Sequence, residues 1–307
     1  MPTSRPSPSY SLTLRIEYEN KLGMLGRITS AVGELGGDIG AIDIVKTTRE
    51  TITRDITFSA ADEKHGGAII TAVRAIPGID IVHVSDRTFL LHLGGKIEVN
   101  SKVPLKTRDD LSMAYVPGVA RIARAIADDP SDVFNLTIKR NSVAVMSDGS
   151  EVLNLGNVGP GAALPVMESK AILMKEFAGI DAYPICLDVK NVDEFVAAVK
   201  AIAPGFGAIH LEDLSSPQCF EIEKKLGEVL DIPVFHNDQH GTAIVVLAAL
   251  INALKIIGKA PQSLRVVVSG AGAAGVATAK LLLAFGVRDV ILCDEQGALH
   301  AGRELNG

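Results

Sequence analysis

Two short apolar runs that each lead into acidic residues constrain the fold of this chain more than any other feature. Ala208–Leu211 is followed directly by Glu212 and Asp213, and Ile232–Phe235 is followed, after two residues, by Asp238. Both runs have the length and apolar content of buried strands in a parallel sheet. Because ligands of open α/β sheets bind beyond the carboxyl ends of the strands, the three carboxylates are expected to meet at that edge.

Three carboxylates at one sheet edge repel one another unless a positive charge lies among them. A hard divalent cation that prefers oxygen ligands, Mg²⁺ or Mn²⁺, suits such a site. The pattern therefore predicts that Glu212, Asp213 and Asp238 bind a metal ion. The alternative is that these acids are solvated strand ends or helix N-caps, which is the commoner role for a single Asp in such a position.

Composition narrows the classes of function. The chain has 307 residues, of which 47% are hydrophobic and 21% charged, enough for two or three domains with ordinary cores. A net charge of −6 argues against nucleic acid as the main partner. No apolar run approaches the length of a membrane span, the N-terminus lacks a signal core, and the three cysteines lack zinc spacing. We therefore expect a cytoplasmic protein with reduced thiols and no membrane partner.

The N-terminal quarter predicts a small regulatory domain. Residues 1–9, rich in Pro and Ser, are expected to be a disordered lead-in. Residues 10–93 give a βαββαβ pattern, which is ferredoxin-like. The turn Asn20–Gly26 resembles the ligand loop of ACT domains, which implies an amino-acid effector. The expected elements are strand Leu12–Tyr18, helix Met24–Leu35, strands Asp38–Val45 and Thr51–Phe58, helix Ala68–Ile76 and strand Ile79–Leu91.

Residues 94–255 are expected to form a parallel-sheet α/β domain. Asp188, Asp213 and Asp238 lie 25 residues apart, each after a candidate strand, which is the spacing of successive βα units. A helix over Pro217–Leu230 is expected between the last two strands, with Pro217 in its first turn. The candidate strands are Ser142–Met146, Ala182–Leu187, Ala208–Leu211 and Ile232–Phe235.

Residues 256–307 predict the start of a Rossmann domain that binds NAD. An apolar strand, Leu264–Ser269, leads into a Gly-x-Gly-x-x-Gly turn and a helix, and Asp294 follows 24 residues after the first glycine. Asp294 and Glu295 favour a ribose hydroxyl over a 2′-phosphate, hence NAD over NADP. A nucleotide-binding domain needs several more βα units, so the chain is expected to continue beyond Gly307. The predicted cofactor residues are Gly270, Gly272, Ala273, Ala274, Gly275 and Asp294.

These segments together resemble the bacterial NAD-type malic enzymes that carry an N-terminal ACT domain. The resemblance extends over nearly all of the chain from Ser11, and several separate motifs occur in the expected order. They are Ser112–Ala120, Ser147–Gly149, Leu155–Pro160, Leu164–Lys170, the pair Glu212–Asp213, and Asn237–Thr242. The last motif departs from the family, because Asn237 stands where many members have a second acid.

The resemblance implies oxidative decarboxylation of malate with NAD⁺ to pyruvate, CO₂ and NADH. By resemblance Lys170 is the base that takes the C2 hydroxyl proton, and Tyr115 is the acid that protonates the enolpyruvate carbon. The alternative is that both residues have only structural roles. Lys170 would then extend from an amphipathic helix so that its charged end reaches water, and Tyr115 would lie on the surface or in the core. A homodimer or higher oligomer is expected.

Two other functions fit the same sequence. One is a regulatory protein whose domains bind small molecules without turnover. The other is an amino-acid dehydrogenase, which shares the domain order but needs no metal, so the paired acids argue against it. His210, His236 and His240 are interpreted as structural neighbours of the acids, since oxygen ligands suit the decarboxylation better than imidazoles do.

Overall fold

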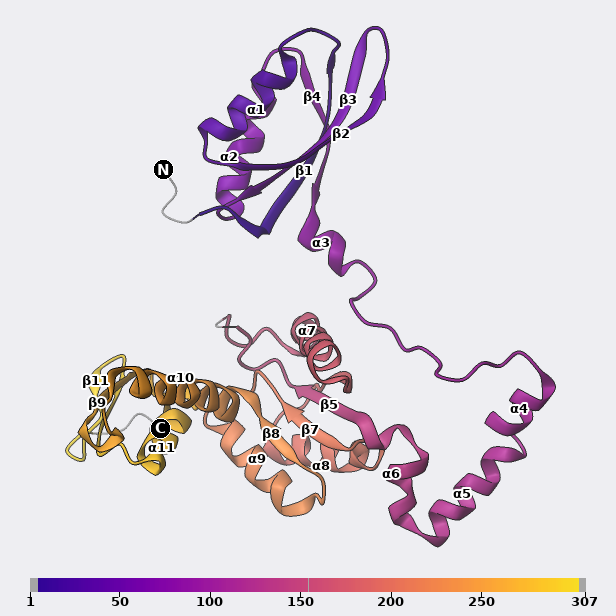
Figure 1. The fold of residues 1–307 in the computed structure, drawn as a ribbon, viewed down its shortest axis with the longest axis vertical. Coiled ribbons are helices and arrows are strands. Elements are labelled where there is room, and N and C mark those ends of the chain that lie inside the picture. Colours follow the sequence, from indigo (N-terminus) through magenta and orange to yellow (C-terminus); the bar gives the residue numbers. More distant parts are fainter. Residues whose placement is uncertain (1–4, 154, 304–307) are drawn as a thin grey trace. The chain divides into compact units, whose positions relative to one another are not determined.

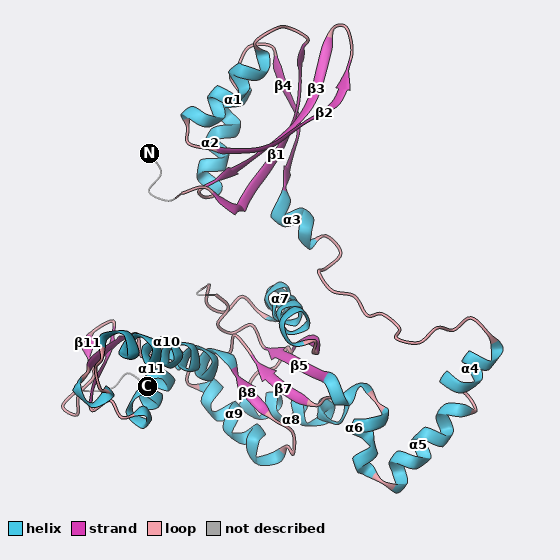
Figure 2. Ribbon diagram, viewed as in Figure 1, coloured by secondary structure: helices cyan, strands magenta, loops and turns pink. Residues whose placement is uncertain are grey.

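In a computed structural model the chain divides into two compact units, residues 1–96 and 97–307, each described here by itself (Figure 1). The structure describes residues 5–153 and 155–303. Figure 2 shows that both units mix helices and strands, as the sequence predicts for an α/β protein.

The first unit is a four-stranded antiparallel sheet with two helices on one face (Figure 2). The strand order is β2-β3-β1-β4, which confirms the ferredoxin-like fold. Alternate residues of the strands, such as Leu14, Ile16 and Ile56, are fully buried against Ile28 and Ile69 of the helices. The elements are β1 Ser7–Glu19, α1 Met24–Glu34, β2 Asp38–Thr47, β3 Thr51–Ala60, α2 Glu63–Arg74 and β4 Ile79–Asp86.

Three boundaries of this unit differ from expectation by five residues, and one of them is the start of α2, which is Glu63 instead of Ala68. β1 begins at Ser7, inside the expected lead-in, of which residues 1–4 lie outside the described residues. The strand expected to run from Ile79 to Leu91 stops at Asp86, and helix α3 (Arg87–His92) follows. The Asp86 carboxylate accepts the backbone N–H of Thr88 at 2.8 Å and that of Phe89 at 3.2 Å. This N-cap satisfies free donors of the first turn and so converts an apolar run into a helix.

The second unit is built on a parallel sheet of order β6-β5-β7-β8. Helix α7 lies on one face of the sheet, and α8 and α9 lie on the other (Figure 1). The core between the sheet and α8 and α9 contains fully buried Met146, Phe195, Leu211 and Leu226. The elements are β5 Ser142–Ser147, α7 Pro160–Ala178, β6 Asp181–Cys186, α8 Val192–Ile202, β7 Ala208–Leu211, α9 Gln218–Val229, β8 Val234–His236 and α10 Thr242–Ile257.

A second sheet of the same unit follows α10. Strands β9 and β10 pair in parallel around helix α11, and the short β11 pairs antiparallel with β10. This is the first βαβ segment of a Rossmann fold, as predicted. The remaining elements are β9 Arg265–Ser269, α11 Ala273–Phe285, β10 Asp289–Asp294, β11 Gly297–Ala298, helices α4 Arg108–Ala114, α5 Gly118–Asp128 and α6 Val133–Leu136, 3₁₀ turns Pro130–Asp132, Ile138–Asn141, Ala203–Gly205 and Pro261–Ser263, and a π-helical turn Asn237–Gly241.

Helix α10 and the π-helical turn before it are more apolar than expected. Together they form a continuous 21-residue helix, Asn237–Ile257, which is long and apolar enough to cross a membrane. The expectation that no apolar run approaches that length was wrong. One such helix is weak evidence for a membrane protein. The helix also packs against α11, and its first turn carries Asp238, one of the predicted metal ligands.

Candidate metal and nucleotide site

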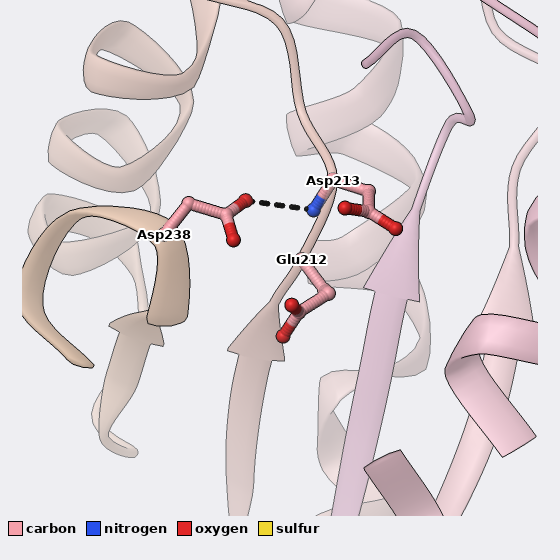
Figure 3. Close-up of side chains that lie close together, drawn as sticks. All are labelled: Glu212, Asp213 and Asp238. Atoms are coloured by element: carbon pink, nitrogen blue, oxygen red, sulfur yellow. Dashed lines mark hydrogen bonds between the residues drawn. The ribbon is translucent and has the colours of Figure 1, made fainter. Parts of the chain in front are cut away.

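The three acids predicted to bind a metal do come together at the carboxyl end of the parallel sheet (Figure 3). Glu212 and Asp213 follow β7, and Asp238 lies in the π-helical turn that follows β8. One carboxylate oxygen from each residue lies within 4.8 Å of the other two. The backbone N–H of Asp213 donates to Oδ2 of Asp238 at 2.9 Å, which fixes the two strand ends relative to each other.

The backbone around Asp213 is constrained by the loop that follows β5. Asp213 has φ +53°, a left-handed conformation that Asp adopts more readily than most residues. Its carbonyl oxygen accepts the hydroxyl of Ser147 at 3.4 Å and the backbone N–H of Glu151 at 3.3 Å. Within that loop a Cβ on Gly149 would lie 2.2 Å from the carbonyl oxygen of Gly159. Only glycine therefore fits this position, which explains the Ser-Asp-Gly motif.

The local electrostatics leave the acids short of positive charge. Burial, and then the carboxylates of Asp238 and Glu212, raise the pKa of Asp213 to about 6. Burial also opposes ionisation of Asp238, but His236 and the backbone N–H of Asp213 outweigh it and lower the pKa of Asp238. Oδ2 of Asp213 is buried and has no hydrogen-bond partner. A buried, unpartnered carboxylate oxygen facing two further carboxylates is the donor set that a hard divalent cation takes, so the residues fit Mg²⁺ or Mn²⁺.

Lys170 reaches this group of acids, whereas Tyr115 does not. Lys170 comes from α7, and its Nζ lies 3.1 Å from Oε1 of Glu212. Its side chain is 27% exposed. Tyr115 follows α4 directly and is 64% exposed. It does not line the cavity that contains the acids and Lys170.

Two histidines and an asparagine next to the acids contact them directly, which the sequence did not indicate. His210 Nε2 lies 2.7 Å from Oε2 of Glu212, and His236 Nε2 lies 3.3 Å from Oδ2 of Asp238. Asn237 donates from Nδ2 to Oε1 of Glu212 at 3.3 Å. Each histidine lies in a strand and precedes by two positions an acid that follows the same strand. That spacing was the available signal for histidines that orient the acids.

One cavity of about 950 Å³ is lined by both the acids and the glycine-rich turn. The turn connects β9 to α11, as the fingerprint predicts. A Cβ on Gly275 would lie 1.8 Å from the carbonyl oxygen of Gly270, so the third glycine is required for the helix to approach the turn. All five predicted residues of the turn, Gly270, Gly272, Ala273, Ala274 and Gly275, line this cavity together with Lys170, Glu212, Asp213 and Asp238.

Asp294 lies at the end of β10, next to the turn. The backbone N–H of Gly270 donates to the carbonyl oxygen of Cys293 at 2.9 Å, which joins the turn to this strand end. The carboxylate of Asp294 is held by Arg303, whose Nη2 donates to both of its oxygens. Arg303 was not predicted from the sequence, because a separation of nine residues from Asp294 carries no periodic signal.

A buried carboxylate cluster that shares a cavity with a dinucleotide-type turn is typical of metal-assisted, nicotinamide-dependent oxidoreductases. Comparison with known families agrees. Residues 94–227 match the malic enzyme N-terminal domain, residues 239–299 match the malic enzyme NAD-binding domain, and residues 6–83 match an ACT domain. The chain belongs to the malic enzyme family and carries an N-terminal ACT domain.

Individual relatives support this assignment. The chain is 58% identical to an NAD-dependent malic enzyme of Geobacillus stearothermophilus, over 94% of this chain and 61% of the relative. It is 44% identical to NAD-dependent malic enzyme 1 of Bacillus subtilis, over 92% of this chain and 65% of the relative. The crystal structure of the NAD-dependent malic enzyme of Thermotoga maritima aligns with a TM-score of 0.68 at 49% identity, covering 71% of this chain and 58% of that one. The chain thus spans less than two thirds of the length of these relatives.

Proposed function

We propose that the protein oxidises malate with NAD⁺ and decarboxylates the product to pyruvate and CO₂, as a soluble cytoplasmic enzyme. The observation that carries the proposal is the shared cavity, in which the acids, Lys170 and the glycine-rich turn face the same space. Hydride transfer requires the substrate carbon to lie beside the nicotinamide, and a single cavity supports that requirement. A dehydrogenase without a metal does not need a buried group of three carboxylates.

Glu212, Asp213 and Asp238 would hold the metal ion, and Gly270, Gly272 and Gly275 would form the turn for the NAD pyrophosphate. The metal supplies a Lewis acid that polarises the substrate oxygen, and NAD⁺ accepts the hydride. The residues around them keep the acids in place. His210 and Asn237 hold the two oxygens of Glu212, and His236 lies beside Asp238.

We assign Lys170 as the base that takes the proton from the C2 hydroxyl of malate. Its Nζ lies at the edge of the acid cluster and lines the cavity in which malate would bind. The half-buried position limits its contact with water, which favours transfer of a proton to and from a substrate.

Tyr115 is the proposed acid that protonates the enolpyruvate carbon. This role rests on the motif Ser112–Ala120, since Tyr115 is exposed and lies outside the cavity.

Helices α4 and α5, on either side of Tyr115, bury no side chain and expose apolar residues such as Leu111 and Met113. We infer that a second copy of the chain covers these helices in a homodimer. Sedimentation equilibrium of the Leu111→Glu variant should show monomer, and an unchanged oligomeric state would contradict the inference.

The first unit is the proposed site for an amino-acid effector. Gly23 precedes α1 in a left-handed conformation, φ +84°, and Leu22 beside it is fully exposed, so this part of the turn lies at the surface of the unit. Equilibrium dialysis against a panel of labelled amino acids tests this role. Absence of binding to every member of the panel would contradict it.

Replacement of Lys170 tests the proposed reaction. In the enzyme with all its domains, Lys170→Ala should lower kcat for malate oxidation about 10²–10⁴-fold while leaving Mn²⁺ affinity intact, since a general base accelerates but does not bind the metal. Lys175→Ala is the matched control, because Lys175 lies on the same helix and pairs with Asp181 at the surface. Equal loss of activity in both variants would show that Lys170 acts through helix stability rather than as a base.

Replacement of Tyr115 separates the two proton transfers. Tyr115→Phe should still decarboxylate added oxaloacetate but should release enolpyruvate, which NMR in deuterated water detects as pyruvate with unselective labelling. The reason is that loss of the acid leaves protonation of the carbon to solvent. A variant that turns over at the wild-type rate with stereospecific protonation would remove Tyr115 from the mechanism.

A further inference from the structure

The carboxylate predicted to select NAD is already engaged in an ion pair. Nη2 of Arg303 donates to Oδ2 of Asp294 at 2.6 Å and to Oδ1 at 2.8 Å. The side chains of Arg303 and Asp294 are only 13% and 27% exposed. The guanidinium also lowers the pKa of Asp294, so the acid is charged when the pair forms.

The turn after β10 holds Arg303 in this position. β10 and β11 form a tight antiparallel hairpin in which Asp294 lies opposite Gly297. Nη1 of Arg303 donates to the carbonyl oxygens of Gly297 at 3.2 Å and Ala298 at 3.4 Å, and Nη2 donates to Oε1 of Gln296 at 2.9 Å. Five acceptors from one hairpin therefore surround a single guanidinium and hold it beside Asp294.

The location of the pair matters for the nucleotide. In a Rossmann fold the acid at the end of the second strand binds the adenosine ribose hydroxyls, and an arginine near that point accommodates a 2′-phosphate. Asp294 occupies the acid position, because Cys293 before it is hydrogen-bonded to Gly270 of the glycine-rich turn. This chain thus has both groups in one ion pair. Arg303 also reduces the negative charge contributed by Asp294 and Glu295 from two to one.

We propose that Arg303 is a specificity-determining residue of the nucleotide site, which lets the ribose subsite accept a 2′-phosphate as well as a 2′-hydroxyl. This rests on the proposed NAD site and limits the preference that Asp294 alone would give. With NAD⁺ the pair stays closed and Asp294 accepts the ribose hydroxyl. With NADP⁺ the guanidinium donates to the phosphate, for which its planar fork is suited, at the cost of its bonds to Asp294.

Binding of ADP-ribose and 2′-phospho-ADP-ribose, followed by calorimetry, tests the proposal without turnover, since neither carries a nicotinamide. The wild-type protein should bind both, ADP-ribose more tightly. Arg303→Gln should weaken binding of the 2′-phosphorylated ligand on the order of tenfold or more, because a charge-assisted contact is lost, and should change ADP-ribose binding less than about threefold. Asp294→Asn frees the guanidinium and should therefore raise the affinity for the 2′-phosphorylated ligand relative to the affinity for ADP-ribose.

Arg265→Gln is the matched control, because Arg265 on β9 forms an exposed ion pair with Asp289, which lies on β10 as Asp294 does. An unchanged ratio of the two affinities in Arg303→Gln, or a wild-type protein that binds ADP-ribose and rejects its 2′-phosphate, would overturn the role of Arg303. Failure of both ligands to bind would instead refute the nucleotide site itself. Equal thermal melting of the Arg303 and Arg265 variants excludes a general loss of folding as the cause.

Discussion

Ionisation of the Asp213 side chain destabilises the folded protein when no metal ion is bound. It is buried, one of its oxygens has no hydrogen-bond partner, and two further carboxylates lie beside it. Burial and these neighbours raise its pKa to about 6. Because the folded chain then binds a proton more tightly than the unfolded chain, the contribution of Asp213 to stability decreases as pH rises from about 4 to about 6. A bound cation removes that cost at neutral pH.

The same pKa predicts how metal affinity depends on pH. Below pH 6 a divalent cation must displace a proton from Asp213, so Mn²⁺ affinity should fall by about fivefold between pH 6 and pH 5 and change little between pH 7 and pH 8. Calorimetric titrations with Mn²⁺ across this range measure the slope. An affinity that stays constant from pH 7.5 to pH 5 would show that Asp213 is ionised without the metal.

At the scale of elements, the turn from β9 into α11 depends on close approach of the backbone. Gly275→Ala should greatly weaken NAD⁺ binding, because the added Cβ would lie 1.8 Å from the carbonyl oxygen of Gly270 and force the helix away from the turn. Gly227→Ala is the control, since Gly227 lies within α9 with open space around it. There the substitution should stabilise the protein by about 0.5–1 kcal/mol. Equal NAD⁺ affinity in both variants would contradict the close approach.

Elements whose residues carry a repeated pattern were predictable from the sequence. β7 has the predicted bounds, and the glycine fingerprint located the β9–α11 turn. α3 was not predictable in this way, because its apolar residues Phe89 to Leu91 extend an apolar strand and only the Asp86 cap turns them into a helix. In the site, the three acids could be predicted to lie together because they follow predicted neighbouring strands. Arg303 and the carboxylate contact of Lys170 depend on how distant segments fold together, which no local pattern records.

At the scale of the whole molecule, the second unit brings two ligand systems into one cavity. The acids come from the parallel sheet around β7, and the glycine-rich turn comes from the separate sheet of β9 and β10, joined to it by α10. The π-helical turn that carries Asp238 continues into α10, and α10 packs on α11, the helix whose N-terminus would face the pyrophosphate. The geometry therefore couples the proposed metal and nucleotide positions through one continuous helix and its neighbour.

The central claim is that Glu212, Asp213 and Asp238 form a divalent-cation site, and a Mn²⁺ titration of wild-type protein and the Asp238→Ala variant tests it most directly. The matched control is Asp193→Ala, which removes an exposed carboxylate that pairs with Lys225 away from the cavity. The wild type and the control should bind one Mn²⁺ with equal affinity, and Asp238→Ala should bind at least about tenfold more weakly, since a charged oxygen ligand is lost. Undiminished affinity in Asp238→Ala would contradict the site.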